Sequence, residues 1–196
     1  MKETEITIEV FDTLDQINRI LKEKGFIVER KYDLIDYYYS KYSIVELNKF
    51  NYKELINNSF LVRQFVDDSP TSSIIFKNKD LDNLGNVIRE EKVKCGIKDL
   101  DNALRIFNLA GLNCWCTLNQ HVLIYKKDSI EFAVQIVDDL GIFIEYEEDD
   151  TMFNMSEQEK IDLMFNALQG LGLKLGKDYS CKKVYLKFKK QLKQQI

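Results

Sequence analysis

Two short acidic patterns, far apart in the chain, could bind a metal ion. Glu3 and Glu5 stand two residues apart in a segment that alternates polar with branched residues, and Glu145 and Glu147 repeat this spacing much later. Because successive side chains of a strand point to opposite faces, each pair lies on one face of its strand. Carboxylates held side by side repel one another unless cations lie between them. The four glutamates are therefore candidate oxygen ligands of a divalent cation, and two solvated acidic strands are the alternative.

Two basic residues could bind an anion. Arg63 and Lys77 lie in segments 59–66 and 73–79, which are typical of the two strands of a hairpin. The only proline, Pro70, favours a turn between them at 67–70. A guanidinium group offers a bidentate fork to phosphate oxygens, so the pair could bind a phosphate. From the residues alone, two surface cations are an equal alternative.

Four other patterns have simpler structural interpretations. Cys114 and Cys116 could form a metal pair, but strand alternation would place both thiols on one face as small core residues. The only histidine, His121, has aromatic and branched neighbours and is more typical of a structural residue. The tyrosines at 37–39 could stack on bases, but few basic residues interleave with them, which favours strand packing. The basic segment 182–195 could contact a membrane or RNA, and a solvated helix face is the default interpretation.

Length and composition favour one ordinary globular domain over residues 1–196. The chain is 45% hydrophobic, which suffices for a sizeable core. Its 28 basic and 32 acidic residues give a net charge of −4, which does not favour a nucleic-acid surface. The first residues contain no apolar leader and no run of 18 apolar residues occurs, so we expect a cytoplasmic protein without a membrane partner. The sequence leaves the oligomeric state open.

The elements expected around these residues form an α+β fold. Alternation predicts a closed or nearly closed antiparallel β-barrel of about eight strands, and helical periodicity predicts helices flanking it. The expected strands are 1–10, 26–39, 59–66, 73–79, 87–95, 112–125, 129–137 and 140–150, and the expected helices are 13–25, 43–50, 99–110, 157–168 and 182–195.

The order of these motifs resembles the CYTH domain, also called the triphosphate tunnel metalloenzyme family. This family includes class IV adenylate cyclases, thiamine triphosphatases and tripolyphosphatases. Its first strand carries Glu-x-Glu-x-Lys, where residues 3–7 read ETEIT, and a later strand carries Leu-Gly-x-Phe-x-Glu-x-Glu, where 140–147 read LGIFIEYE. Residues 36–39, DYYY, are similar to its Asp-x-Tyr-Phe segment, and 184–185, VY, to its near-terminal Ser-Tyr. The resemblance covers nearly the whole chain and implies that the barrel is a tunnel.

The resemblance also implies the roles of individual residues. Glu3, Glu5, Glu145 and Glu147 would hold one or two Mg²⁺ or Mn²⁺ ions. The predicted catalytic residues, which also bind substrate, are Arg63, Lys77 and Arg89. Lys182 and Lys183 would add further contacts to the substrate. The site is partly degenerate, because uncharged residues replace charged ones at Thr7, Leu61, Gln120 and Gln135.

Three functions follow from the resemblance. The first is metal-dependent hydrolysis of an inorganic or organic triphosphate, such as tripolyphosphate, ATP or thiamine triphosphate. The second is binding of a nucleotide, a polyphosphate or a protein without turnover, which the missing charges favour. The third is formation of cyclic AMP from ATP. The residues before Glu3 do not contain the cyclase His-Phe signature, so we expect hydrolysis rather than cyclisation.

Overall fold

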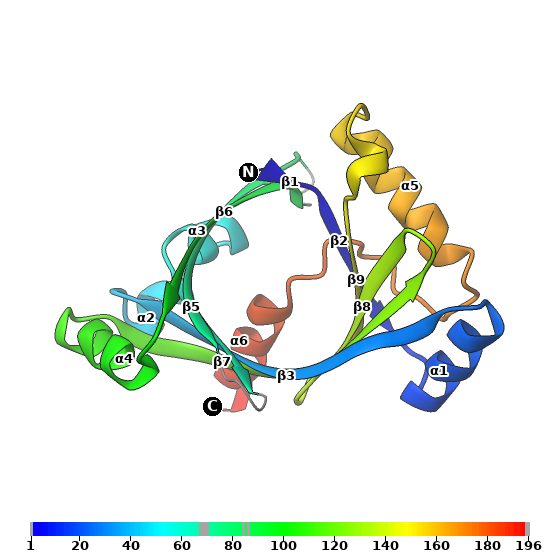
Figure 1. The fold of residues 1–196 in the computed structure, drawn as a ribbon. Coiled ribbons are helices and arrows are strands. Elements are labelled where there is room, and N and C mark those ends of the chain that lie inside the picture. The colour runs from blue at the N-terminus through cyan, green and yellow to red at the C-terminus, as the bar shows by residue number, and fades with distance from the viewer. Residues whose placement is uncertain (1, 67–70, 84, 86, 195–196) are drawn as a thin grey trace.

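The computed structural model describes residues 2–66, 71–83, 85 and 87–194. Within this part of the chain, nine strands form one antiparallel sheet in the order β1-β6-β5-β4-β3-β7-β8-β9-β2 (Figure 1). The strands are β1 (Lys2–Glu3), β2 (Glu5–Val10), β3 (Ile27–Ser40), β4 (Phe60–Val66), β5 (Ser72–Leu81), β6 (Val87–Ile97), β7 (Asn113–Lys127), β8 (Ile130–Val137) and β9 (Gly141–Glu147). The helices are α1 (Leu14–Glu23), α2 (Ile44–Leu47), α3 (Tyr52–Asn57), α4 (Leu100–Leu109), α5 (Glu157–Gln169) and α6 (Lys183–Gln194), with a short 3₁₀ turn η1 (Asp150–Met152). The turn predicted at 67–70 lies outside the described residues.

The sheet curls because one N-terminal stretch pairs with both of its ends. In β1, Glu3 lies opposite Glu90 of β6, whereas in β2 Glu5 lies opposite Glu147 of β9. Only Thr4 separates β1 from β2, so the two outermost strands of the sheet are consecutive in the chain. The result is the nearly closed antiparallel barrel that alternation predicted (Figure 1).

The gap between β2 and β6 is filled by the chain that leads into α6. The backbone N–H of Thr7 donates to the carbonyl of Tyr179 at 2.9 Å, and the N–H of Cys181 donates to the carbonyl of Thr7 at 2.9 Å. On the other side the backbone N–H of Val87 donates to Ser180 Oγ at 2.7 Å. Segment 174–181 therefore joins the two edges of the sheet; we call it the seam segment.

Two large hydrophobic clusters and a smaller one pack the described part of the barrel. Outside, α1 and α5 cover β2, β8 and β9, with Ile8, Ile144 and Met164 fully buried (Figure 1). A second core joins α2, α3 and α6 to β3, β4 and β7, and it includes Leu55 and Phe188. Helix α3 was not predicted, although Asn51 and Glu54 form a capping box at its start.

The prediction for the two neighbouring cysteines was wrong for one of them. Cys116 is buried, but Cys114 is exposed. The register between β3 and β7 shifts at this point, since Tyr38 lies opposite Cys116 and Tyr39 lies opposite Cys114. Trp115 is therefore an extra residue in β7, and such a bulge interrupts simple alternation.

Within the described residues, no helix has both the length and the apolar character needed to cross a membrane.

We expect the seam to depend on the Ser180 hydroxyl. Replacing Ser180 with alanine leaves the buried N–H of Val87 without its acceptor, which should lower the free energy of unfolding by about 1–3 kcal/mol in a urea titration. Ser129→Ala, in the exposed β7–β8 turn, is the control and should change it by less than about 0.5 kcal/mol. Equal stability of the two variants would contradict this account of the seam.

Candidate metal and polyanion site

A cavity of about 190 Å³ lies inside the barrel, with room for several water molecules. Its described lining is dominated by charge of both signs. The cations are Arg63, Lys77, Lys79, Lys92, Lys94 and Lys183, and the carboxylates are Glu5, Asp36, Glu145 and Glu147.

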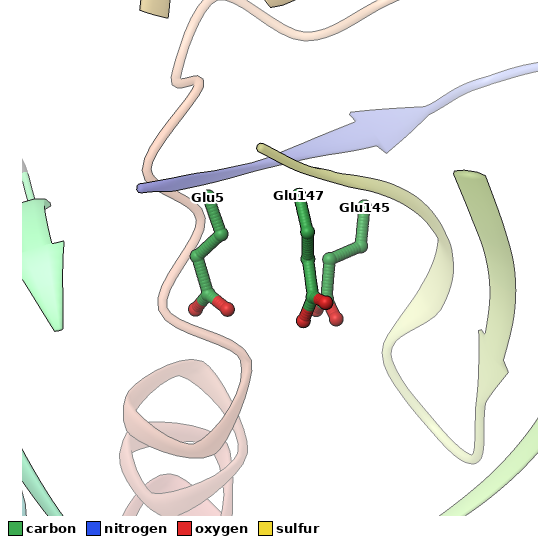
Figure 2. Close-up of side chains that lie close together, drawn as sticks. All are labelled: Glu5, Glu145 and Glu147. Carbon is green, nitrogen blue, oxygen red and sulfur yellow. The ribbon is translucent and has the colours of Figure 1, made fainter. Parts of the chain in front are cut away.

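The carboxylates of Glu5, Glu145 and Glu147 converge on one point. Figure 2 shows Glu5 on β2 and the other two on β9, all projecting to the same side. One oxygen of each lies within 4.8 Å of those of the others. The pairing of β2 with β9 produces this arrangement, because it places Glu5 directly opposite Glu147. The side chains of Glu5 and Glu145 are only 11% and 20% exposed, whereas that of Glu147 is 56% exposed.

The donor set fits Mg²⁺ or Mn²⁺, because both ions prefer carboxylate oxygens. Lysines balance the charge of these carboxylates: Glu5 contacts Lys79 and Lys92, each at 3.2 Å, and Glu145 contacts Lys183 at 3.0 Å. Burial alone would raise the pKa of Glu5, but the lysines outweigh it and hold the pKa well below the usual value. The pKa of Glu145 is lowered in the same way, with Lys183 as the main cation opposing its burial. The site thus contains ionised ligands that a cation could share.

A basic wall of the cavity adjoins these carboxylates. Lys77 and Lys79 come from β5 and Lys92 from β6, where Lys77 lies directly opposite Lys92. Their ammonium groups surround Glu90, at 3.1 Å from Lys77, 2.6 Å from Lys79 and 3.3 Å from Lys92. Burial would lower the pKa of Lys79, but Tyr52 and the carboxylates of Glu5 and Glu90 raise it well above its usual value. Lys79 is therefore charged and able to bind an anion.

Arg63 adds a fixed cation from β4. Its guanidinium group donates to both carboxylate oxygens of Asp36 at 2.7 Å, and Gln120 Nε2 donates to the same carboxylate at 3.1 Å. Asp36 is buried, whereas the Arg63 side chain is 28% exposed. Burial opposes the charge of Arg63, but Asp36 outweighs it and raises the pKa of the guanidinium group. Arg63 thus remains charged while part of its guanidinium faces the cavity.

Helix α6 brings Lys183 to the carboxylates. The Lys183 ammonium group donates to Glu145 at 3.0 Å and also to Gln135 Oε1. Its neighbour Lys182 does not line the cavity and lies over the ring of Tyr52, 5.6 Å from the ring centre. The start of α6 therefore contributes Lys183 to the site but not Lys182.

The structure brings together most, but not all, of the residues that the sequence singled out. Glu5, Arg63, Lys77, Lys183, Glu145 and Glu147 line the cavity. Arg89 does not line it: its guanidinium pairs with Asp80 at 2.8 Å and approaches Glu157 at 3.6 Å. The backbone of Glu3 pairs with β6, but its side chain lies outside the described residues.

Sequence reasoning missed Glu90 and the lysines at 79, 92 and 94. Alternation along β5 could have found Lys79, because it lies two residues beyond Lys77 on the same face. In β6 the sequence singled out Arg89, whereas the buried residue is its neighbour Glu90.

Four residues are uncharged where the family that the sequence resembles has a charged residue, and most of them lie around the cavity. Thr7 and Gln120 line it, and Gln135 contacts Lys183. Leu61 is part of the hydrophobic core instead.

Comparison with solved structures identifies proteins that share this fold. The PH1012 protein from Pyrococcus horikoshii OT3 aligns over 95% of this chain and 98% of its own, with a TM-score of 0.70 and 17% identity. A structure from Vibrio parahaemolyticus, described as a putative adenylate cyclase, covers 87% of this chain and 88% of its own, with a TM-score of 0.57 and 16% identity.

One sequence relative agrees with this likeness. "Putative adenylate cyclase MJ0240" from Methanocaldococcus jannaschii is 27% identical over 124 residues, which are 63% of this chain and 67% of the relative. No protein-family model matches the chain.

The lowered pKa values of the buried carboxyl groups make the free energy of unfolding depend on pH. A carboxyl group whose pKa is lower in the folded state contributes stability that is complete above its unfolded pKa, about 4.3, and is lost as the pH falls through its folded value. Glu5, Glu90 and Glu145 all have lowered pKa values. We therefore expect the free energy of unfolding, measured with urea, to be level above about pH 5 and to fall steeply from pH 4.3 downwards.

Lys183→Met tests this link at one carboxylate. Without Lys183, less charge opposes the burial that raises the pKa of Glu145, so the variant should be less stable at neutral pH and should lose less stability as the pH falls. Lys193→Met, near the exposed end of the same helix, is the matched control and should leave the profile unchanged. A profile for Lys183→Met identical to that of Lys193→Met would contradict the pairing.

Proposed function

We propose that this chain is a CYTH-like protein that binds a triphosphate together with Mg²⁺ or Mn²⁺ in the barrel cavity and hydrolyses the terminal phosphate. The observation that supports this most strongly is that an acidic wall and a basic wall meet in one cavity, where Lys79 and Lys92 each lie 3.2 Å from Glu5. A polyanion needs several cations at once, and a divalent cation needs several oxygen ligands.

Burying so many ionic groups costs free energy, so they are expected to serve a function other than stability. Apolar residues of similar volume would often stabilise a protein as well as a buried ion pair does. Glu5, Lys79 and Glu90 are 11% or less exposed at the side chain. A bound cation and polyanion are the ligands that such a cavity would match in charge.

Each wall would have its own role. Glu5, Glu145 and Glu147, with Glu3 by resemblance, would hold the metal, which when bound neutralises phosphate charge and acidifies water. Lys77, Lys79, Lys92 and Arg63 would bind phosphoryl oxygens and stabilise the charge that spreads over them in the transition state. Lys183 would move from Glu145 towards the substrate when a metal occupies the carboxylates.

Formation of cyclic AMP from ATP is the second candidate. The names of the Methanocaldococcus and Vibrio relatives favour it. The same walls could serve either reaction, because both need a charged triphosphate held beside a metal. The products separate the two candidates: hydrolysis releases orthophosphate, whereas cyclisation releases diphosphate and cyclic AMP.

Binding and turnover can be measured separately. We expect Mn²⁺ with tripolyphosphate or ATP to raise the melting temperature well above the effect of either alone, as ligands of the folded state do. Orthophosphate release should follow at a rate proportional to protein concentration. Stabilisation without release indicates a binding module, and cyclic AMP from ATP indicates the cyclase. If the ligands neither stabilise the protein nor yield a product, the proposed function is wrong.

Glu147→Gln tests the metal ligands. This side chain is the most exposed of the three carboxylates, so its replacement should disturb the fold least. We expect the affinity for Mn²⁺, measured by calorimetry, to fall about tenfold or more, which is about 1.4 kcal/mol. Glu131→Gln, exposed on β8, removes the same charge away from the cavity and should have no effect. Equal Mn²⁺ affinity of the two variants rules out Glu147 as a ligand.

A further inference from the structure

Glu90 is a carboxylate without solvent contact in the basic wall of the cavity. Its side chain is 0% exposed, and it contacts the ammonium groups of Lys77, Lys79 and Lys92 at 2.6 to 3.3 Å. Burial would raise the pKa of Glu90, but these lysines outweigh both burial and the nearby Glu5, and they lower it. Glu90 is therefore an anion at the centre of a cluster of cations.

The lysines would repel one another without this anion. Lys77 lies directly opposite Lys92 in the register of β5 and β6, and like charges in that relation destabilise a sheet. Lys79 lies directly opposite Glu90 on the same face. Glu90 thus attracts its cross-strand neighbour, one diagonal neighbour and Lys92 of its own strand to one point, so that flexible side chains share one arrangement.

Glu5 also contacts two of these lysines, but its role differs. It lies 3.2 Å from both Lys79 and Lys92, and it converges with Glu145 and Glu147 on the candidate metal position. Glu90 does not belong to that convergent group of carboxylates. It can therefore hold the lysines whether or not Glu5 turns towards a cation.

We propose that Glu90 is a positioning residue that holds Lys77, Lys79 and Lys92 as one cluster, and that this cluster selects a chain of linked phosphates over a single phosphate. The proposal rests on the proposed function, because it assigns these lysines to the substrate. A single phosphate can be satisfied by one or two lysines wherever they lie. Linked phosphates need several ammonium groups in fixed relation, since each misplaced contact weakens binding.

The proposal predicts an effect opposite to that of charge alone. Glu90→Gln makes the cavity more positive by one charge, so simple attraction predicts tighter binding of every anion. If Glu90 positions the lysines, its loss should instead lower the affinity for linked phosphates. We expect metal-free affinity for tripolyphosphate, measured by calorimetry, to fall about tenfold, while affinity for orthophosphate stays level or rises.

Two further variants make the comparison specific. Glu91→Gln removes the same charge from the exposed face of the same strand and should bind both anions as the unmodified chain does. Glu90→Asp keeps the charge but is one methylene shorter, so it should recover part of the tripolyphosphate affinity. Unchanged or tighter tripolyphosphate binding by Glu90→Gln overturns the proposal. So does an equal loss for both anions, which indicates general damage to the fold.

A crystal structure of Glu90→Gln tests positioning without any ligand. We expect the ammonium groups of Lys77, Lys79 and Lys92 to move apart, with at least one turning to solvent. If all of them remain around residue 90, Glu90 does not position them and the proposal fails. If the unmodified chain binds no tripolyphosphate, the proposed function fails, and with it the selection of linked phosphates.

Discussion

The attraction between lysines of one wall and glutamates of the other is the interaction on which the interior of this barrel depends. Lys79 and Lys92 lie between Glu5 on β2 and Glu90 on β6, so they connect the two sides of the seam through side chains. Each of these groups would be costly to bury alone, because an unpaired buried charge costs several kcal/mol. Their mutual neutralisation allows a polar cavity to exist inside a small barrel whose remaining interior is apolar.

This balance also explains how the site can be charged and still stable without a ligand. Arg63 is matched by Asp36, and Lys183 by Glu145, so these two cations have partners from the protein itself. A bound triphosphate and metal would replace these ion-pair partners. The energetic cost of that exchange is small when each leaving contact is replaced by one of equal charge. Hydrolysis, cyclisation and binding without turnover would all begin with this exchange, because each needs a charged triphosphate beside a metal.

Sequence reasoning predicted the barrel and part of the site, since alternation depends on local spacing. It placed Glu5, Glu145 and Glu147 on inward faces, because β2 and β9 are regular and two-residue periodicity holds along them. It failed where an irregularity or a partner strand decides the face. The bulge at Trp115 turned Cys114 outward, and the face of β6 that carries Glu90 could not be assigned without its register to β5. Helix α3 was missed because its six residues are too few to show a helical period.

The barrel can close only after the seam segment has been synthesised. Strand β2 is synthesised well before its neighbours, β9 and residues 174–181. Pairings between such distant parts of a chain form slowly, because a long loop must be closed before the contacts compensate for it. During synthesis on the ribosome, β2 must therefore wait with an unpaired edge, and the charged interior forms only after residues 174–181 have emerged.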